Sequence, residues 1–278
     1  LAQHLAQDGY RIVEAPTPST KRLRGRGKTD TLDALTAARS TLVTKMEHLR
    51  DRRSGQLHAA LGVLTTAREQ MRTDKVRSVN ALTALLRTHA LGLDARKALT
   101  TAQIKTVAAW RPRQEELGAA TARAQAVRYA QRIGQLDQEL KDNQQRLSAL
   151  VSEQAPALLE MFGVGPATAA TVLTVWSHTG RIRSEGAFAQ IAGACPIPAS
   201  SGNTIRHRLN RGGDRQLNQA LHTIVLTRMS KDQATRDYVQ RRIAQGRTKR
   251  EIMRCLKRYV SRQIYRTLAA DPPVALAA

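Results

Sequence analysis

The stretch AATARAQAVRYAQRIGQLDQELKDNQQRLSALV, residues 119–151, decides the fold class of this chain. Its apolar residues recur at alternating intervals of three and four, a period that fits a long helix and not a strand. The repeat is carried by Ile133, Leu136, Leu140, Leu147 and Leu150, with Asn143 in the same seam. This seam predicts either a coiled coil, in which the polar residue selects register or partner, or a helix packed within its own domain.

The composition favours packed helices throughout. The chain has 278 residues, of which 41% are hydrophobic and only 3% aromatic, so its core depends on Ala, Leu, Ile and Val. Ala and Leu favour helices, whereas a strand-rich protein would use more aromatic and β-branched residues. We therefore expect a mainly α protein, long enough for two domains and a connector.

The charge points to a polyanionic partner. Lys and Arg number 45 against 22 Asp and Glu, a formal net charge of +23. Such an excess repels itself unless a polyanion neutralises it, and DNA or RNA phosphates do so with release of counterions. No apolar run approaches the roughly 18 residues of a transmembrane helix, although a basic helix lying on a membrane surface is an alternative.

Cysteine usage and the first residues bear on location. Cys195 and Cys255 have neither metal-ligand spacing nor the pattern of a disulfide framework. The opening residues LAQHLAQDGY are too polar for a signal peptide, and their pattern is typical of the later part of a helix. We expect a cytoplasmic, nucleoid-associated bacterial protein whose chain begins inside a domain.

Periodicity and turn residues outline the other elements. Apolar spacing, glycines and prolines predict a helix over 1–8, a short strand at 10–13, and helices from 29–30, over 56–110, over 214–231 and over 248–269. Pro156 ends the long helix, and a second domain follows it.

Asp30 and Asp33 are the best candidate metal ligands. They stand three apart in the first turn of an expected helix, so both carboxylates lie on one face. Mg²⁺ binds through one or two carboxylates together with water and substrate phosphate. The alternative is that both acids only stabilise a helix N-terminus by capping and by the helix dipole.

Two further segments carry possible chemistry. FGVGPATA, residues 162–169, is typical of a helix-hairpin-helix, in which Gly163 and Gly165 let backbone amides approach a phosphate, although a tight helical turn looks alike. Ser200 and Ser201 precede Gly202 in a loop, where a serine serves either as a nucleophile or as an ordinary turn residue.

Taken together, these segments resemble the transposases of insertion-sequence family 110, the bridge-RNA-guided recombinases. The resemblance rests on the order of GKTDTLDA (27–34), the helical connector, FGVGPATA (162–169), AGACP (192–196), SSG (200–202) and RGGDRQL (211–217). It covers nearly the whole chain, and the ordered set is more specific than any one motif.

The resemblance implies both a domain plan and a chemistry. Residues 1–115 would be the C-terminal part of a RuvC-like domain of RNase H fold with a helical extension, and residues 116–155 would form a coiled-coil connector. Residues 156–270 would form an all-α transposase domain with a helix-hairpin-helix and a serine loop, and residues 271–278 would be a tail. Asp30 and Asp33 resemble the last two acids of a four-carboxylate Mg²⁺ site, and Ser201, or Ser200 in its place, resembles the serine that attacks DNA. The first two acids would precede this chain, so the alternative is a non-catalytic nucleic-acid-binding remnant.

The resemblance also implies partners. We expect DNA, a structured guide RNA, and further copies of the chain assembled through the coiled coil. Phosphate contacts are expected from Lys21, Arg22, Arg24, Arg26, Lys28, Arg206, Arg208, Arg211 and Arg215.

Overall fold

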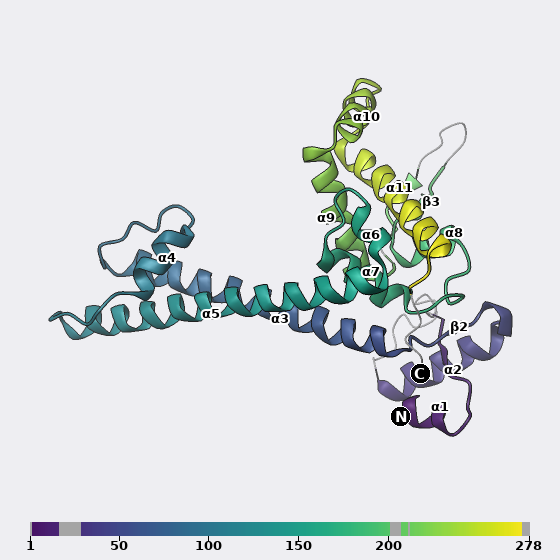
Figure 1. Ribbon diagram of the computed structural model, residues 1–278, viewed down its shortest axis with the longest axis horizontal. Helices are drawn as coiled ribbons and strands as arrows, with labels where there is room; N and C mark the ends of the chain where they lie inside the picture. Colours follow the sequence, from purple (N-terminus) through teal and green to yellow (C-terminus); the bar gives the residue numbers. More distant parts are fainter. Residues whose placement is uncertain (1, 17–28, 201–206, 211, 274–278) are drawn as a thin grey trace. The chain divides into compact units, whose positions relative to one another are not determined.

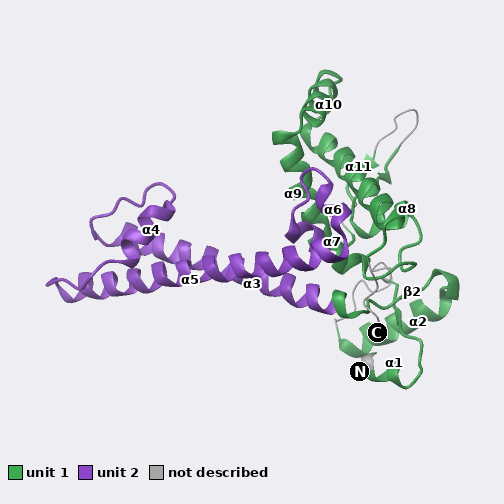
Figure 2. Ribbon diagram, in the orientation of Figure 1, with its two compact units in different colours: residues 1–58, 172–278 green, residues 59–171 purple. Residues whose placement is uncertain are grey.

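The computed structural model confirms a mainly α protein (Figure 1). It describes every residue except 1, 17–28, 201–206, 211 and 274–278. The chain divides into two compact units, residues 1–58 with 172–278, and residues 59–171 (Figure 2). No helix in the described part of the chain is both long enough and apolar enough to span a membrane.

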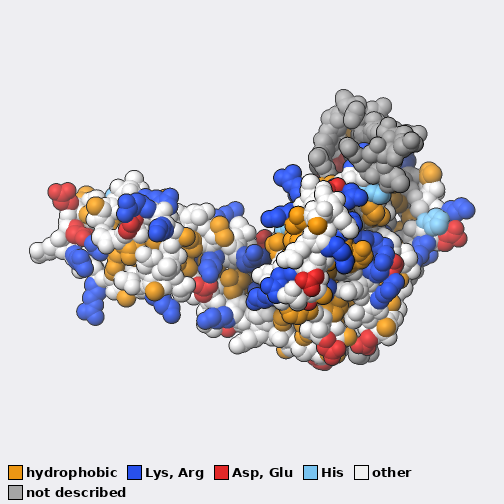
Figure 3. All heavy atoms as spheres, turned by 90° about the horizontal axis from the view of Figure 1, so that it is seen from above, with side chains coloured by type: hydrophobic (Ala, Val, Ile, Leu, Met, Phe, Trp, Pro, Cys, Tyr) orange, Lys and Arg blue, Asp and Glu red, His pale blue; other side chains and the backbone are white. Residues whose placement is uncertain are grey.

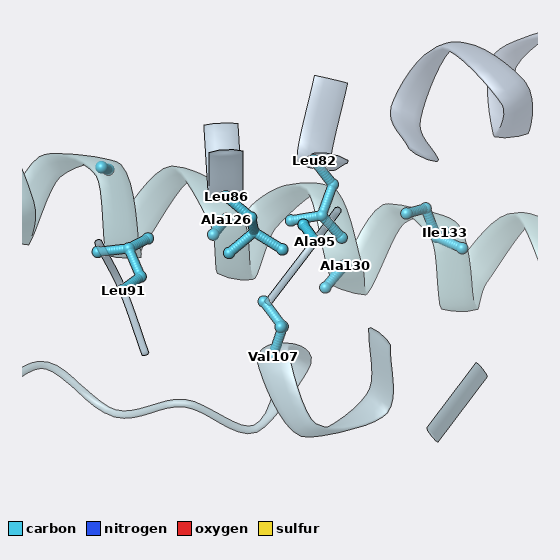
Figure 4. Close-up of a cluster of buried hydrophobic side chains, with 9 residues drawn as sticks. Leu82, Leu86, Leu91, Ala95, Val107, Ala126, Ala130 and Ile133 are labelled. Carbon is cyan, nitrogen blue, oxygen red and sulfur yellow. The ribbon is translucent and has the colours of Figure 1, made fainter. Parts of the chain in front are cut away.

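The unit of residues 59–171 is built on two long helices. These are α3 (Gln56–Thr88) and α5 (Leu117–Gln154), and α4 (Thr101–Ala108) packs against α5. A cluster of buried side chains joins the three helices, with Leu82 and Leu86 from α3, Val107 from α4, and Ala126 and Ala130 from α5 (Figure 4). The small alanines let the helices approach closely, and the leucines fill the space between them.

The seam of α5 finds its partner in the same chain. Ile133, Leu136, Asn143 and Leu147 are buried. The Asn143 Nδ2 donates to the backbone oxygen of Leu64 at 2.9 Å, and Arg68 Nη1 donates to the Asn143 side chain at 3.3 Å. The polar seam residue therefore pairs with α3 of the same chain, and assembly of several chains through α5 remains a prediction.

We predict that Asn143→Ala lowers the free energy of unfolding by about 1–3 kcal/mol, because it removes the hydrogen bonds that the buried Asn143 side chain makes with the Leu64 oxygen and with Arg68. Urea denaturation followed by circular dichroism measures this change. Gln145→Ala, at an exposed position of the same helix, is the control and should change the midpoint little. Equal midpoints for the two variants would contradict a stabilising role for the polar seam residue.

The N-terminal part of the other unit is made of short elements. They are α1 (Ala2–Gln7), β1 (Val13–Glu14), α2 (Asp30–Val43), the 3₁₀ helix η2 (Met46–His48) and β2 (Arg50–Asp51). The two strands pair antiparallel, with Val13 opposite Asp51 and Glu14 opposite Arg50. The strand expected at 10–13 is therefore formed, but only from Val13 onward.

Helices dominate the C-terminal part of the same unit. They are the end of α7 (Pro166–Trp176), α8 (Glu185–Ile191), α9 (Arg215–Lys231), α10 (Gln233–Ala244) and α11 (Lys249–Ala270). Helices α8, α9 and α10 pack against α11. Trp176, Phe188 and Tyr265 meet in a cluster of edge-on and tilted rings, so three of the chain's few aromatic residues share one core. The helices expected over 214–231 and 248–269 are confirmed.

The compact units do not follow the three segments expected from the family resemblance. Residues 1–58 belong with 172–278, and the long helices form the second unit. The assignment of 1–115 to a RuvC-like remnant and of 156–270 to a transposase domain remains a prediction.

Candidate functional site

The acidic pair lies at the first turn of α2. Thr29 caps this helix, and its hydroxyl oxygen accepts the amide of Leu32 at 3.3 Å. Asp30 and Asp33 follow the cap, and both are exposed. Because Thr29 already caps the helix, neither carboxylate is needed as the cap, and both are accessible to a ligand.

The pair offers part of a magnesium site. Two exposed carboxylates at a helix N-terminus suit an ion that keeps water and phosphate among its ligands. No group of three or more His, Cys, Asp or Glu with metal-binding geometry occurs within the described residues. The basic segment before the pair, with Lys21, Arg22, Arg24, Arg26 and Lys28, lies outside the described residues.

The candidate serine belongs to a β-hairpin. Strands β3 (Ile197–Pro198) and β4 (His207–Arg208) pair antiparallel, with Ile197 opposite Arg208 and Pro198 opposite His207. Residues 199–206 therefore connect the two strands. Ser200 is exposed, as are His207 and Arg208, whereas Ser201, Arg206 and Arg211 lie outside the described residues. Along the chain, the serine segment therefore lies between Pro198 of β3 and His207 of β4.

Two loops meet backbone to backbone at the base of this hairpin. The amide of Asp214 donates to the carbonyl oxygen of Ile191 at 2.7 Å. Gly213 has φ +97°, and a Cβ atom there would lie 2.4 Å from that carbonyl oxygen. Gly193 has φ +63°, and its Cβ would lie 2.8 Å from the Gly212 oxygen. Only glycine permits both the positive φ and this close approach.

Asp214 fixes the start of α9 and ties it to a distant segment. Its carboxylate accepts the amide of Leu217 at 3.0 Å and the Arg53 guanidinium at 3.2 Å. Arg53 also lies 3.7 Å from Glu14, which accepts a hydrogen bond from the buried Arg181 at 2.6 Å. These four side chains join β1 and the segment after β2 to the helix that follows the serine hairpin.

Two cations of the expected phosphate contacts can be placed. Arg208 on β4 and Arg215 at the first turn of α9 are both exposed. Figure 3 shows Lys and Arg side chains spread over the face in view, with fewer Asp and Glu between them. Sequence reasoning missed Arg53, because its partner Asp214 stands 161 positions away and no local pattern connects the two.

The glycine turn joins two short helices. Helix α6 (Pro156–Glu160) is followed by Gly163 at φ +82° and then by α7. The Gly165 amide donates to the Thr168 hydroxyl at 2.9 Å, and that hydroxyl donates back to the Gly165 oxygen at 2.8 Å. In this conformation the Gly165 amide is already hydrogen-bonded to Thr168, so phosphate recognition by this turn remains a prediction.

Two half-buried histidines of this unit have a lowered pKa. Burial lowers the pKa of His178, and the nearby Arg181 lowers it further. Burial likewise lowers the pKa of His222, with a smaller contribution from Lys257. Both shifts favour the neutral imidazole over the cation.

Comparison with known proteins identifies the class. Residues 155–240, which contain the glycine turn and the serine hairpin, match the model of the Transposase IS116/IS110/IS902 family. The chain is 36% identical over 95 residues to the insertion element IS110 uncharacterized 43.6 kDa protein of Streptomyces coelicolor. That match covers 34% of this chain but only 24% of the relative.

A second relative matches over a longer range. The insertion element IS116 uncharacterized 44.8 kDa protein of Streptomyces clavuligerus is 24% identical over 290 aligned residues, covering 87% of this chain and 72% of that protein. The chain is therefore similar to insertion-sequence transposases of the IS116/IS110/IS902 family, with the family model matching residues 155–240.

Proposed function

We propose that the protein carries out DNA strand transfer for an insertion sequence, with Ser201 as the nucleophile, assistance from Mg²⁺ and direction by a guide RNA. The observation that carries the proposal is that the segment matching the transposase family contains the serine hairpin and its exposed cations. The test is the formation of a covalent protein–DNA adduct that depends on this serine.

The proposed step is a transesterification at phosphorus. The Ser201 oxygen forms a bond to the phosphorus atom, and the bond from phosphorus to one deoxyribose oxygen breaks. The serine proton passes to solvent, and the released sugar oxygen takes up a proton. One phosphate ester replaces another, so the later attack of a new DNA hydroxyl on the serine ester needs no external energy source.

Asp30 and Asp33 are the residues that would hold the metal ion. A bound Mg²⁺ would supply positive charge beside the phosphate and stabilise the charge that develops there. Around it, the chain's own cations have a separate role: Arg208 and Arg215 would hold the DNA backbone and fix its position relative to the serine hairpin.

A non-catalytic nucleic-acid-binding role is the second candidate. It is favoured by the acidic pair, since no third acid joins Asp30 and Asp33 in a metal-binding group within the part of the chain that the structure describes. This role keeps the phosphate contacts and loses the covalent step, so the adduct assay separates the two candidates.

Both candidates predict strongly salt-dependent DNA binding. If six to ten phosphates are contacted, affinity should fall by about 10³–10⁵ between 50 and 200 mM salt, because each contact releases condensed counterions. Fluorescence anisotropy with a short duplex at four salt concentrations measures the slope. A flat response would contradict phosphate recognition by this chain.

A further inference from the structure

Helix α11 carries a row of arginines at strict four-residue spacing. We call this the arginine ridge: Arg250, Arg254, Arg258, Arg262 and Arg266. Residues four apart form a continuous ridge on a helix surface. At 1.5 Å per residue, neighbouring arginines are about 6 Å apart along the axis and the ridge is about 24 Å long.

The opposite side of the same helix is apolar and buried. Its buried residues share the same four-residue spacing, two positions after each arginine: Ile252, Leu256, Val260, Ile264 and Leu268. Two residues correspond to about 200° around the helix, so the two rows lie on opposite faces. The packing of the apolar row into the core leaves Arg250 and Arg266 exposed, whereas the three arginines between them are only partly exposed.

The ridge has far more positive charge than its surroundings neutralise. Residues 249–270 contain seven Lys and Arg and one Glu, and that Glu251 caps the helix with Thr248. Glu185 of α8 lies 3.5 Å from Arg258, 3.0 Å from Arg262 and 3.3 Å from Arg266. One carboxylate thus serves three guanidinium groups, and within the described chain no acid lies within ion-pair distance of Arg250 or Arg254.

We infer that the arginine ridge docks on the phosphate backbone of duplex DNA. The inference rests on the proposed function and adds to it a surface that neither the glycine turn nor the serine hairpin provides. A DNA strand presents one phosphate per about 3.4 Å of axis, so neighbouring guanidinium groups about 6 Å apart along the helix can meet every second phosphate, although the row turns about 40° around α11 at each step. Guanidinium groups bind phosphate oxygens with paired, charge-assisted hydrogen bonds.

A membrane is a poorer partner for this helix. A basic helix binds a lipid surface by inserting its apolar face among the acyl chains. The apolar row of α11 is already buried in the protein core, with Ile264 fully inaccessible and Leu268 1% exposed. The ridge can therefore offer only charge, which suits a regular polyanion.

The decisive experiment uses the 278-residue chain and a short duplex DNA. The double variant Arg250→Gln with Arg254→Gln removes two neighbouring ridge cations that have no acid within ion-pair distance among the described residues. We expect the salt slope to fall by about two, so that the affinity ratio between 50 and 200 mM salt shrinks about tenfold relative to the parent chain. The control, Arg72→Gln with Arg77→Gln, removes two exposed cations of α3 that pair with acids one turn away, and should leave the slope unchanged.

A second variant tests the same surface in the opposite direction. Glu185→Gln removes the carboxylate shared by three ridge arginines and should increase both DNA affinity and the salt slope. The inference is overturned if the parent chain binds DNA while the Arg250/Arg254 variant matches the control pair. It is also overturned if that variant loses only binding to phosphatidylserine vesicles. Absence of DNA binding by the parent chain would remove the proposed function as well.

Discussion

Ser201→Ala is expected to abolish the covalent protein–DNA adduct completely. Alanine lacks the oxygen that would bond to phosphorus, and no rearrangement of the hairpin restores it. The measurement is denaturing gel electrophoresis of end-labelled DNA after incubation with Mg²⁺, in which an adduct survives detergent and migrates with the protein. We expect DNA affinity to stay within about twofold, since one hydroxyl contributes little to backbone binding.

Ser200→Ala is the matched control, because it removes a hydroxyl one position away on the same hairpin. It should retain the adduct. An adduct that persists in Ser201→Ala and disappears in Ser200→Ala would move the nucleophile to Ser200. Absence of adduct in the parent chain, with DNA binding intact, would favour the non-catalytic role.

The sequence was sufficient to predict most helices, because their signals are local. Thr29 and Asp30 marked the start of α2, and the structure shows Thr29 as its cap. The apolar spacing over 248–269 predicted α11, which spans Lys249–Ala270. Helix α10 (Gln233–Ala244) was not predicted, because the segment is largely polar. Only Thr235 in this helix is buried.

Partners far apart in the chain could not be predicted in the same way. The seam of α5 indicated that a helix would cover it, but the sequence left open whether that helix belonged to another chain; α3 of the same chain covers it. The salt bridge between Arg53 and Asp214 is likewise invisible to local patterns, because it depends on two segments that meet only after folding.

The arginine ridge is a different case, since its spacing was present in the sequence. Arginines two positions before each apolar residue of a helix define an outward face by geometry alone. What the sequence could not supply was Glu185, which lies on α8 and gathers three of the five arginines. The structure therefore distinguishes the neutralised half of the ridge from its free end at Arg250 and Arg254.

Gly213→Ala is expected to lower the free energy of unfolding by about 3 kcal/mol or more. About 1–2 kcal/mol comes from placing a side chain at positive φ, and the rest comes from contact of the new Cβ with backbone. That Cβ would lie 2.4 Å from the Ile191 oxygen and 2.8 Å from the Gly193 nitrogen. Since neither atom belongs to a flexible side chain, the loops at the hairpin base must separate.

Gly246→Ala isolates the contribution of the close approach. Gly246 has φ +76°, similar to Gly213, but a Cβ there meets nothing within 4 Å. Gly246→Ala should therefore lower the free energy of unfolding only by the backbone strain, about 1–2 kcal/mol. Urea denaturation of both variants gives the difference directly, and equal losses would show that the two loops do not touch in solution. If they do touch, Gly213→Ala should also reduce the adduct yield more than Gly246→Ala, because Gly213 lies at the base of the hairpin whose connecting segment contains the proposed nucleophile.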